Sequence, residues 1–176
     1  ERGRFGMAIY SKYPIINKGF LGFKNSSNEI IYADIIRKKD TIRVYNIHLQ
    51  SLSISPDKEN FGKENSEKLI KTLEHNFKKQ AIQTETFLAH EKKWKGKKIV
   101  CGDFNNTAYS WVYNKISENK KDAFLEAGEG FSKTFRYWFP MRIDFILTDN
   151  TANIQQYKSY SYKYSDHFPI SARINW

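Results

Sequence analysis

The chain has 176 residues, of which 40% are hydrophobic and 27% are charged. This length fits one domain with a substantial core and is short for two ordinary domains. No apolar run approaches the roughly 18 residues that a membrane-spanning helix needs, so we expect no membrane span in this chain.

Lysine and arginine outnumber aspartate and glutamate by 29 to 19, and the formal net charge of +10 favours an anionic partner such as nucleic acid, an anionic membrane surface or a phosphorylated small molecule. Cys101 is the only cysteine, which excludes an internal disulfide and predicts a small buried side chain.

The first third of the chain predicts three strands. Residues 6–16 are typical of a strand that ends at Pro14. Residues 29–36 and 41–49 predict two further strands, and the polar residues 37–40 between them predict the turn of a hairpin.

The rest of the chain alternates between helix and strand. Residues 64–94 carry apolar side chains at mostly helical spacing, which predicts an amphipathic helix that covers a sheet. Residues 98–102 are a short apolar run typical of a central strand buried on both faces, and Ser110 can cap a brief helix. Two last strands are predicted at 142–148 and 168–174. With no internal repeat or linker, this order indicates one α/β layered domain.

Polar residues gather at the ends of two predicted strands. The period of two in a strand places Asn46, His48 and Gln50 on one face, and it places Asp103 and Asn105 on one face after the apolar run. A carboxylate can hold a hard cation or position a water, and an amide can donate to a phosphate oxygen without adding negative charge. The alternatives are a hydrogen-bonded core histidine at 48 and an Asx-turn that ends the strand at 103.

Two further polar sets lie toward the C-terminal end. Asp144 is a single carboxylate within an apolar strand, and because burial of an unpaired charge is costly it needs a cationic, histidine or metal partner. Asp166 and His167 are adjacent at the entrance of a strand, where Asp166 could bind a metal and His167 could transfer a proton or contact phosphate. The alternative is a surface Asp–His pair in a loop.

Five segments in order resemble the motifs of the endonuclease/exonuclease/phosphatase superfamily. They are residues 6–15 (GMAIYSKYPI), 46–49 (NIHL), 102–105 (GDFN), 142–145 (RIDF) and 165–170 (SDHFPI). The resemblance implies an α/β fold, a four-layer α/β sandwich with two mixed β-sheets flanked by helices. The active site is then expected at one edge of the sandwich. Residues 1–176 would be the C-terminal two-thirds of such a domain.

The resemblance also implies roles for individual residues. Asp103 and Asn105 would position the nucleophilic water and the transition-state phosphate. Asp166 would contribute to the metal site, and His167 would contact phosphate with Asp144 orienting it.

His48 matches the histidine of the deoxyribonuclease-like and sphingomyelinase-like branches, where it is proposed to be a phosphate ligand or an acid. The implied activity is divalent-metal-dependent hydrolysis of phosphate esters, with Mg²⁺ expected and Mn²⁺ as the alternative. The charge favours a nuclease over a sphingomyelinase-like enzyme or an inositol-phosphate phosphatase. A second hypothesis is a non-catalytic nucleic-acid-binding module that uses the basic surface and the 16% of aromatic residues.

The resemblance leaves two strands unaccounted for. Family members have a strand with an asparagine and a strand with the principal magnesium-binding glutamate before the first of these motifs, and here only five residues precede it. Glu1 lies too close to Gly6 to be that ligand. We therefore expect an N-terminal segment of the same domain to be a partner of residues 1–176, and we expect residues 1–176 alone to bind metal weakly, to show little activity and to self-associate.

Overall fold

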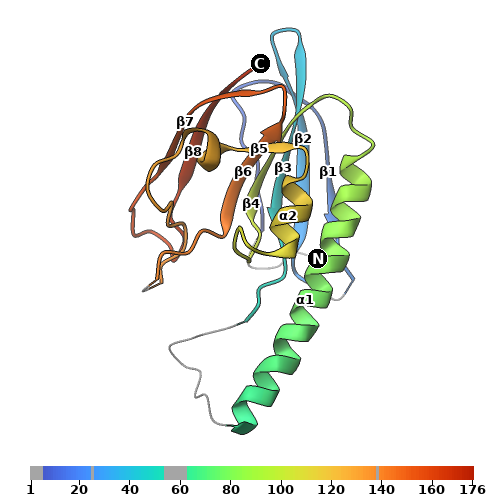
Figure 1. Cartoon of the computed structure of the whole chain (residues 1–176). Coiled ribbons are helices and arrows are strands. Elements are labelled where there is room, and N and C mark those ends of the chain that lie inside the picture. Colours follow the sequence, from blue (N-terminus) through green and yellow to red (C-terminus); the bar gives the residue numbers. More distant parts are fainter. Residues whose placement is uncertain (1–5, 25, 54–62, 138) are drawn as a thin grey trace.

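The computed structural model describes residues 6–24, 26–53, 63–137 and 139–176, so Glu1 lies outside the described residues. Within these segments a mixed sheet of six strands has the order β1-β2-β3-β4-β6-β5. Its members are β1 (Ile15–Gly22), β2 (Glu29–Arg37), β3 (Asp40–His48), β4 (Lys97–Asp103), β5 (Lys120–Asp122) and β6 (Asp144–Asp149). Strands β3 and β4 are parallel and the other neighbours are antiparallel. Figure 1 shows that the long helix α1 (Lys63–Glu91) makes the connection from β3 to β4.

The main core lies between this sheet and two helices, α1 and α2 (Trp111–Ser117). Tyr45 and Ile47 of β3 are completely buried on this face, and the Tyr45 ring meets Phe87 of α1 edge-on with 5.1 Å between centroids. Ile116 of α2 is buried in the same cluster. The alternation predicted for β3 is therefore confirmed, with its apolar side chains toward the helices.

A smaller sheet packs on the opposite face of β6. It consists of the antiparallel strands β7 (Asn153–Ser159) and β8 (Ile170–Asn175), and it packs with the short helix α3 (Ala123–Ala127). Ala123, Ile154 and Tyr157 are buried in this second cluster, with Ile146 of β6 against them. In Figure 1 the six-stranded sheet accordingly lies between α1 and the β7–β8 pair. The predicted fold class, an α/β architecture with two sheets and flanking helices, is confirmed. None of the described helices is long and apolar enough to cross a membrane.

Several predicted elements are confirmed. Strands β2 and β3 form the expected hairpin, in which Arg37 pairs with Asp40 and Lys38 takes a positive φ of 57° in the turn. Helix α1 begins one residue before the predicted range 64–94 and ends three residues before the end of that range. Ser110 caps α2 by accepting a hydrogen bond from the backbone N–H of Tyr113 at 3.1 Å.

The prediction of a strand at residues 6–16 is wrong. Residues 6–14 have no regular secondary structure, and the edge strand β1 begins just after Pro14. A proline is tolerated at the start of an edge strand because its missing N–H is not needed there, and here the Pro14 carbonyl accepts a hydrogen bond from the N–H of Ile36.

The burial expected for β4 is also only partly right. Val100 is completely buried on the helix face, whereas Cys101 on the opposite face is only partly buried. The Cys101 Sγ lies 3.3 Å from the carbonyl oxygen of Tyr45, and burial raises the pKa of its thiol to about 11. Cys101 is thus an unreactive thiol at neutral pH.

A buried ion pair fastens the segment that precedes β6. The guanidinium of Arg142 donates to the Asp122 carboxylate at 2.7 Å, and the Tyr113 hydroxyl donates to the same carboxylate at 2.7 Å. Asp122 also caps α3 by accepting from the N–H of Phe124. Because the buried Asp122 carboxylate accepts three hydrogen bonds, it connects Arg142, just before β6, to α2 and α3.

Candidate active site

Three neighbouring strands place one titratable residue each in a single row. His48 of β3 pairs in register with Asp103 of β4, and Asp103 pairs in register with Asp144 of β6. All three lie on the face of the sheet opposite to α1 and α2, because Ile47, Val100 and Phe145 occupy the helix face. The sheet therefore brings together residues that are separated by up to 96 positions in the sequence.

The two oxygens of the Asp103 carboxylate have different roles. Oδ1 accepts a hydrogen bond from the N–H of Asn105 at 2.7 Å, which is an Asx-turn at the end of β4. Oδ2 lies 3.9 Å from His48 Nε2 and 3.9 Å from His167 Nε2. The Asx-turn interpretation of Asp103 is thus confirmed, while its second oxygen faces two imidazoles and leaves the predicted catalytic role a prediction.

His167 and Asp144 form a hydrogen-bonded pair. His167 Nδ1 lies 2.9 Å from Asp144 Oδ2, and this contact directs Nε2 toward Asp103. Thr134 holds the pair from behind, because its hydroxyl oxygen accepts from the N–H of Asp144 and its carbonyl accepts from the N–H of Phe168. The partner required by the Asp144 carboxylate is therefore the neighbouring histidine.

The electrostatics of the site differ from residue to residue. Burial and the neighbouring Asp144 carboxylate raise the pKa of Asp103 to about 7. The hydrogen bond to Asp144 raises the pKa of His167, whereas burial and the nearby His167 lower the pKa of His48. At a common pH His167 is consequently protonated to a greater extent than His48.

Asn105 does not have the strand geometry that the sequence analysis assumed for it. Strand β4 ends at Asp103, and Asn105 adopts a left-handed backbone with φ of 50°. Its side-chain amide donates to the carbonyl of Leu49 at 2.8 Å, which ties the loop after β4 to the loop after β3. Gln50 likewise lies beyond the end of β3, so neither residue has the strand geometry assumed for it.

Asp166 lies at the margin of the site. Its carboxylate is exposed and accepts a hydrogen bond from the Ser165 hydroxyl at 3.0 Å. Among the described residues, the acidic and histidine side chains close enough together to hold a metal are Asp103, Asp144 and His167, without Asp166. The charge of Asp166 nevertheless raises the pKa of both Asp103 and His167.

A group of buried amides on α1, absent from the sequence interpretation, supports both loops of the site. Gln80 is completely buried, donates to the carbonyl of Gln50 at 2.7 Å and to that of Asn105 at 3.3 Å, and accepts from the side chain of Asn106 at 2.9 Å. Gln83 accepts from the N–H of Gln50 at 2.8 Å. Asn76, one turn before Gln80, donates to the carbonyl of Leu52. These three amides are four and three positions apart, so they lie on one side of the helix, the side that faces the sheet. This spacing can be recognised in the sequence.

We expect Gln80→Leu to loosen this support. The change keeps the volume but leaves buried carbonyls and the Asn106 amide without their partner, which should lower the free energy of unfolding by about 2–3 kcal/mol. Turnover should fall with it, because Asn105 and Asn106 lose their anchor. Urea denaturation is the measurement, with Glu85→Leu on the exposed side of α1 as the control. An unchanged denaturation midpoint in Gln80→Leu would contradict the prediction.

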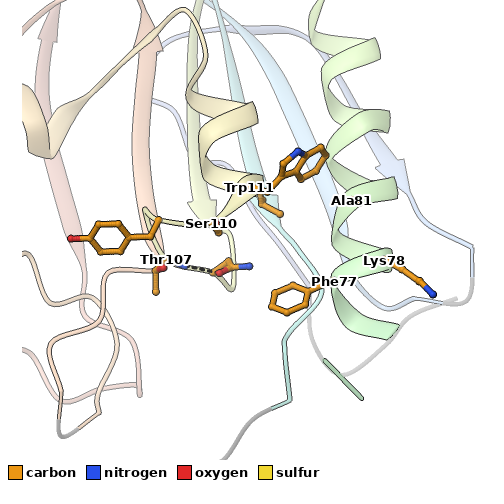
Figure 2. Close-up of a pocket in the computed structure, with 9 residues that line it drawn as sticks. Phe77, Lys78, Ala81, Thr107, Ser110 and Trp111 are labelled. Carbon is orange, nitrogen blue, oxygen red and sulfur yellow. Dashed lines mark hydrogen bonds between the residues drawn. The ribbon is translucent and has the colours of Figure 1, made fainter. Parts of the chain in front are cut away.

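The cleft at the site differs from a larger pocket elsewhere on the described part of the chain. A cleft of about 540 Å³ is lined by Asn46, Asp144, His167 and Pro169, with Tyr10 at its side. A larger pocket of about 640 Å³ lies between α1 and the start of α2. Figure 2 shows Phe77 and Trp111 on either side of it and Lys78 turned away. This larger pocket contains none of the titratable row, whereas Asp144 and His167 line the smaller cleft, which is therefore the candidate site.

Comparison with known proteins finds a family model that matches most of the chain. Residues 1–167 match the sequence model of the Endonuclease/Exonuclease/phosphatase family. A search of curated protein sequences finds none that matches this chain.

Solved structures share the fold at low sequence identity. An endonuclease/exonuclease/phosphatase from Bacteroides vulgatus superposes with a TM-score of 0.67 at 18% identity, covering 93% of this chain and 66% of that chain. The mannosyl-6-phosphatase Bt3783 of Bacteroides thetaiotaomicron gives 0.61 at 16% identity, covering 94% and 68%. Beta toxin of Staphylococcus aureus gives 0.56 at 22% identity, covering 93% and 65%. The chain thus spans about two thirds of the length of the proteins it resembles.

Proposed function

Because the chain belongs to the endonuclease/exonuclease/phosphatase family, we propose that the protein is a divalent-metal-dependent hydrolase of phosphate esters. The observation that supports this most is the row of His48, Asp103 and Asp144 on adjacent strands, with His167 held against its end. Such a row offers a base, a hydrogen-bond donor and carboxylates on one face of the sheet, and in-line displacement at phosphorus can use all three.

Each side chain has a distinct task in this proposal. Asp103 Oδ2 accepts the proton of the attacking water, and its Asx-turn keeps the carboxylate from rotating away. His167, whose cationic form is favoured by Asp144, donates from Nε2 to a phosphate oxygen and stabilises the charge that develops there. His48 contacts the phosphate from the other side of Asp103, and Asn105 positions the water or the phosphate from its anchored loop.

The carboxylates of the site fit a hard cation. Asp103 and Asp144 lie close enough to raise the pKa of Asp103, and a bound cation would relieve that repulsion. We propose that Asp166 contributes to holding the ion, which would be Mg²⁺ with Mn²⁺ as the alternative, at the margin of the site. A cation there supplies Lewis-acid stabilisation of the phosphate oxygens.

For the substrate class we propose a nucleic acid. The net charge of +10 favours a polyanion. One structural relative is a mannosyl-6-phosphatase, so phosphate monoesters belong in the test. Hydrolysis of a panel of DNA, RNA, sphingomyelin, inositol phosphates and mannose 6-phosphate would compare these classes directly, and a preference for any class over both nucleic acids would replace this assignment.

Removing divalent ions should abolish hydrolysis. We expect the activity of the full-length protein on a generic phosphodiester such as bis(p-nitrophenyl) phosphate to disappear in excess EDTA and to return when Mg²⁺ or Mn²⁺ is added beyond the chelator. The carboxylates of the site are anionic, so a bound cation is needed to offset their charge and that of the phosphate. The measurement is release of p-nitrophenol, with circular dichroism as the control for retained fold. Turnover that persists in EDTA would exclude the metal mechanism.

A further inference from the structure

The loop between β7 and β8 carries a ladder of three tyrosines. The rings of Tyr160 and Tyr162 stack with 5.7 Å between centroids and 6° between planes, and Tyr164 follows at 6.0 Å and 32°. The three residues alternate with Ser161 and Lys163, so a period of two puts the rings on one side of the extended loop.

The ladder is anchored at one end and open at the other. Tyr160 donates its N–H to the carbonyl of Pro169 at 2.9 Å, and its hydroxyl lies 3.1 Å from that of Ser171 on β8. Tyr162 is 55% exposed and Tyr164 is 94% exposed. The outer ring of the stack is therefore open to another flat ring, while its base is fixed to the sheet.

The open end lies close to the candidate active site in the chain. Only Ser165 and Asp166 separate Tyr164 from His167, so the Cα atoms of Tyr164 and His167 are at most about 11 Å apart. Basic side chains accompany the ladder. Lys163 lies within it, and the exposed Arg136 donates its backbone N–H to the carbonyl of Asp166 at 2.7 Å.

We propose that Tyr160, Tyr162 and Tyr164 form a stacking subsite for the bases of a single-stranded nucleic acid whose phosphate lies at His167. Successive bases can extend a stack of aromatic rings only when they are released from a duplex, and lysine or arginine nearby attracts the phosphates between them. A membrane surface is a poorer fit, because residues 158–166 contain no aliphatic side chain, phenylalanine or tryptophan to insert among lipids. This subsite rests on the proposed function, because it specifies a single-stranded nucleic acid as the substrate of the same site.

The test is fluorescence anisotropy with a short fluorescein-labelled oligothymidylate at low salt in EDTA, so that binding is measured without cleavage. Tyr164→Leu should weaken binding on the order of tenfold, because one base–aromatic stack is lost. Tyr164→Phe, which keeps the ring, should bind within twofold of the parent. Phe20→Leu is the matched control, since Phe20 is an exposed aromatic residue on the edge strand β1. A duplex of the same length should bind equally to the parent and to Tyr164→Leu.

The outcomes separate this subsite from the proposed function. The subsite is overturned if the parent does not bind the oligonucleotide, if Tyr164→Leu binds as the parent does, or if Phe20→Leu weakens binding equally. It is also overturned if Tyr164→Leu impairs only binding to vesicles of sphingomyelin and phosphatidylcholine. Because the assay needs no turnover, a protein that binds through the ladder but hydrolyses no phosphate ester would overturn the proposed function and leave the subsite standing.

Discussion

Asp103→Asn should lower turnover by about a hundred- to ten-thousandfold while leaving the fold intact, since a positioned acid–base group contributes that range. Asparagine keeps the Oδ1 acceptor for the N–H of Asn105, so the Asx-turn survives, but it can neither accept the proton of a water nor bind a cation as a carboxylate does. The measurement is turnover of a phosphodiester with Mg²⁺ at saturating substrate.

The stability of the same variant gives an independent check. Because burial and Asp144 raise the pKa of Asp103 from 3.8 to about 7, the folded state binds the proton more tightly than the unfolded state does. In EDTA the parent should therefore lose stability as the pH rises from about 4 through about 7, and Asp103→Asn should lack this part of the loss. Asp40→Asn at the opposite end of β3, an exposed partner of Lys97, is the control for both readouts. If Asp103→Asn keeps the parental turnover, the role assigned to Asp103 is wrong.

Gly102→Ala should destabilise the protein by roughly 3 kcal/mol or more, the sum of a left-handed backbone and a steric clash. Gly102 has φ of +132°, and a Cβ there would lie 2.1 Å from the carbonyl oxygen and 2.6 Å from the nitrogen of Ile47. Both atoms belong to the β3 backbone, which cannot move without breaking the pairing of β3 with β4. The row of His48 and Asp103 should be disrupted together with the sheet.

Urea denaturation of a matched pair separates the two causes. Gly130 also has a positive φ, +71°, but a Cβ there would meet nothing within 4 Å. Gly130→Ala should therefore cost only about 1 kcal/mol from the backbone conformation. Equal losses in the two variants would show that the clash at Ile47 has no energetic weight.

Periodicity in the sequence predicted much of what positions the site. The alternation in β3 predicted that Tyr45 and Ile47 lie on the face opposite to His48, and the structure confirms this and shows that their face is the core. The polar turn between β2 and β3 and the Ser110 cap of α2 were equally readable, because each depends on residues within a few positions of one another.

Other features depend on contacts that periodicity does not encode. Asn105 was expected to share a face with Asp103 just after the strand, but its backbone is left-handed, and a single backbone reversal leaves no trace in side-chain alternation. The role of Gln80 depends on carbonyls of Gln50 and Asn105, which come from loops far away in the chain. The first strand was predicted too early in the chain, because Pro14 was interpreted as the end of that strand, whereas β1 begins just after it.

The row formed by His48, Asp103 and Asp144 has a consequence for how this protein can diversify. Its spacing is set by backbone hydrogen bonds between neighbouring strands, which fix them about 4.8 Å apart whatever the side chains are. Loops such as the one that bears Tyr164 are under no such constraint. Selection can therefore exchange the groups that recognise the rest of a substrate while the reacting centre keeps its dimensions, so relatives with one shared reaction centre can serve very different esters.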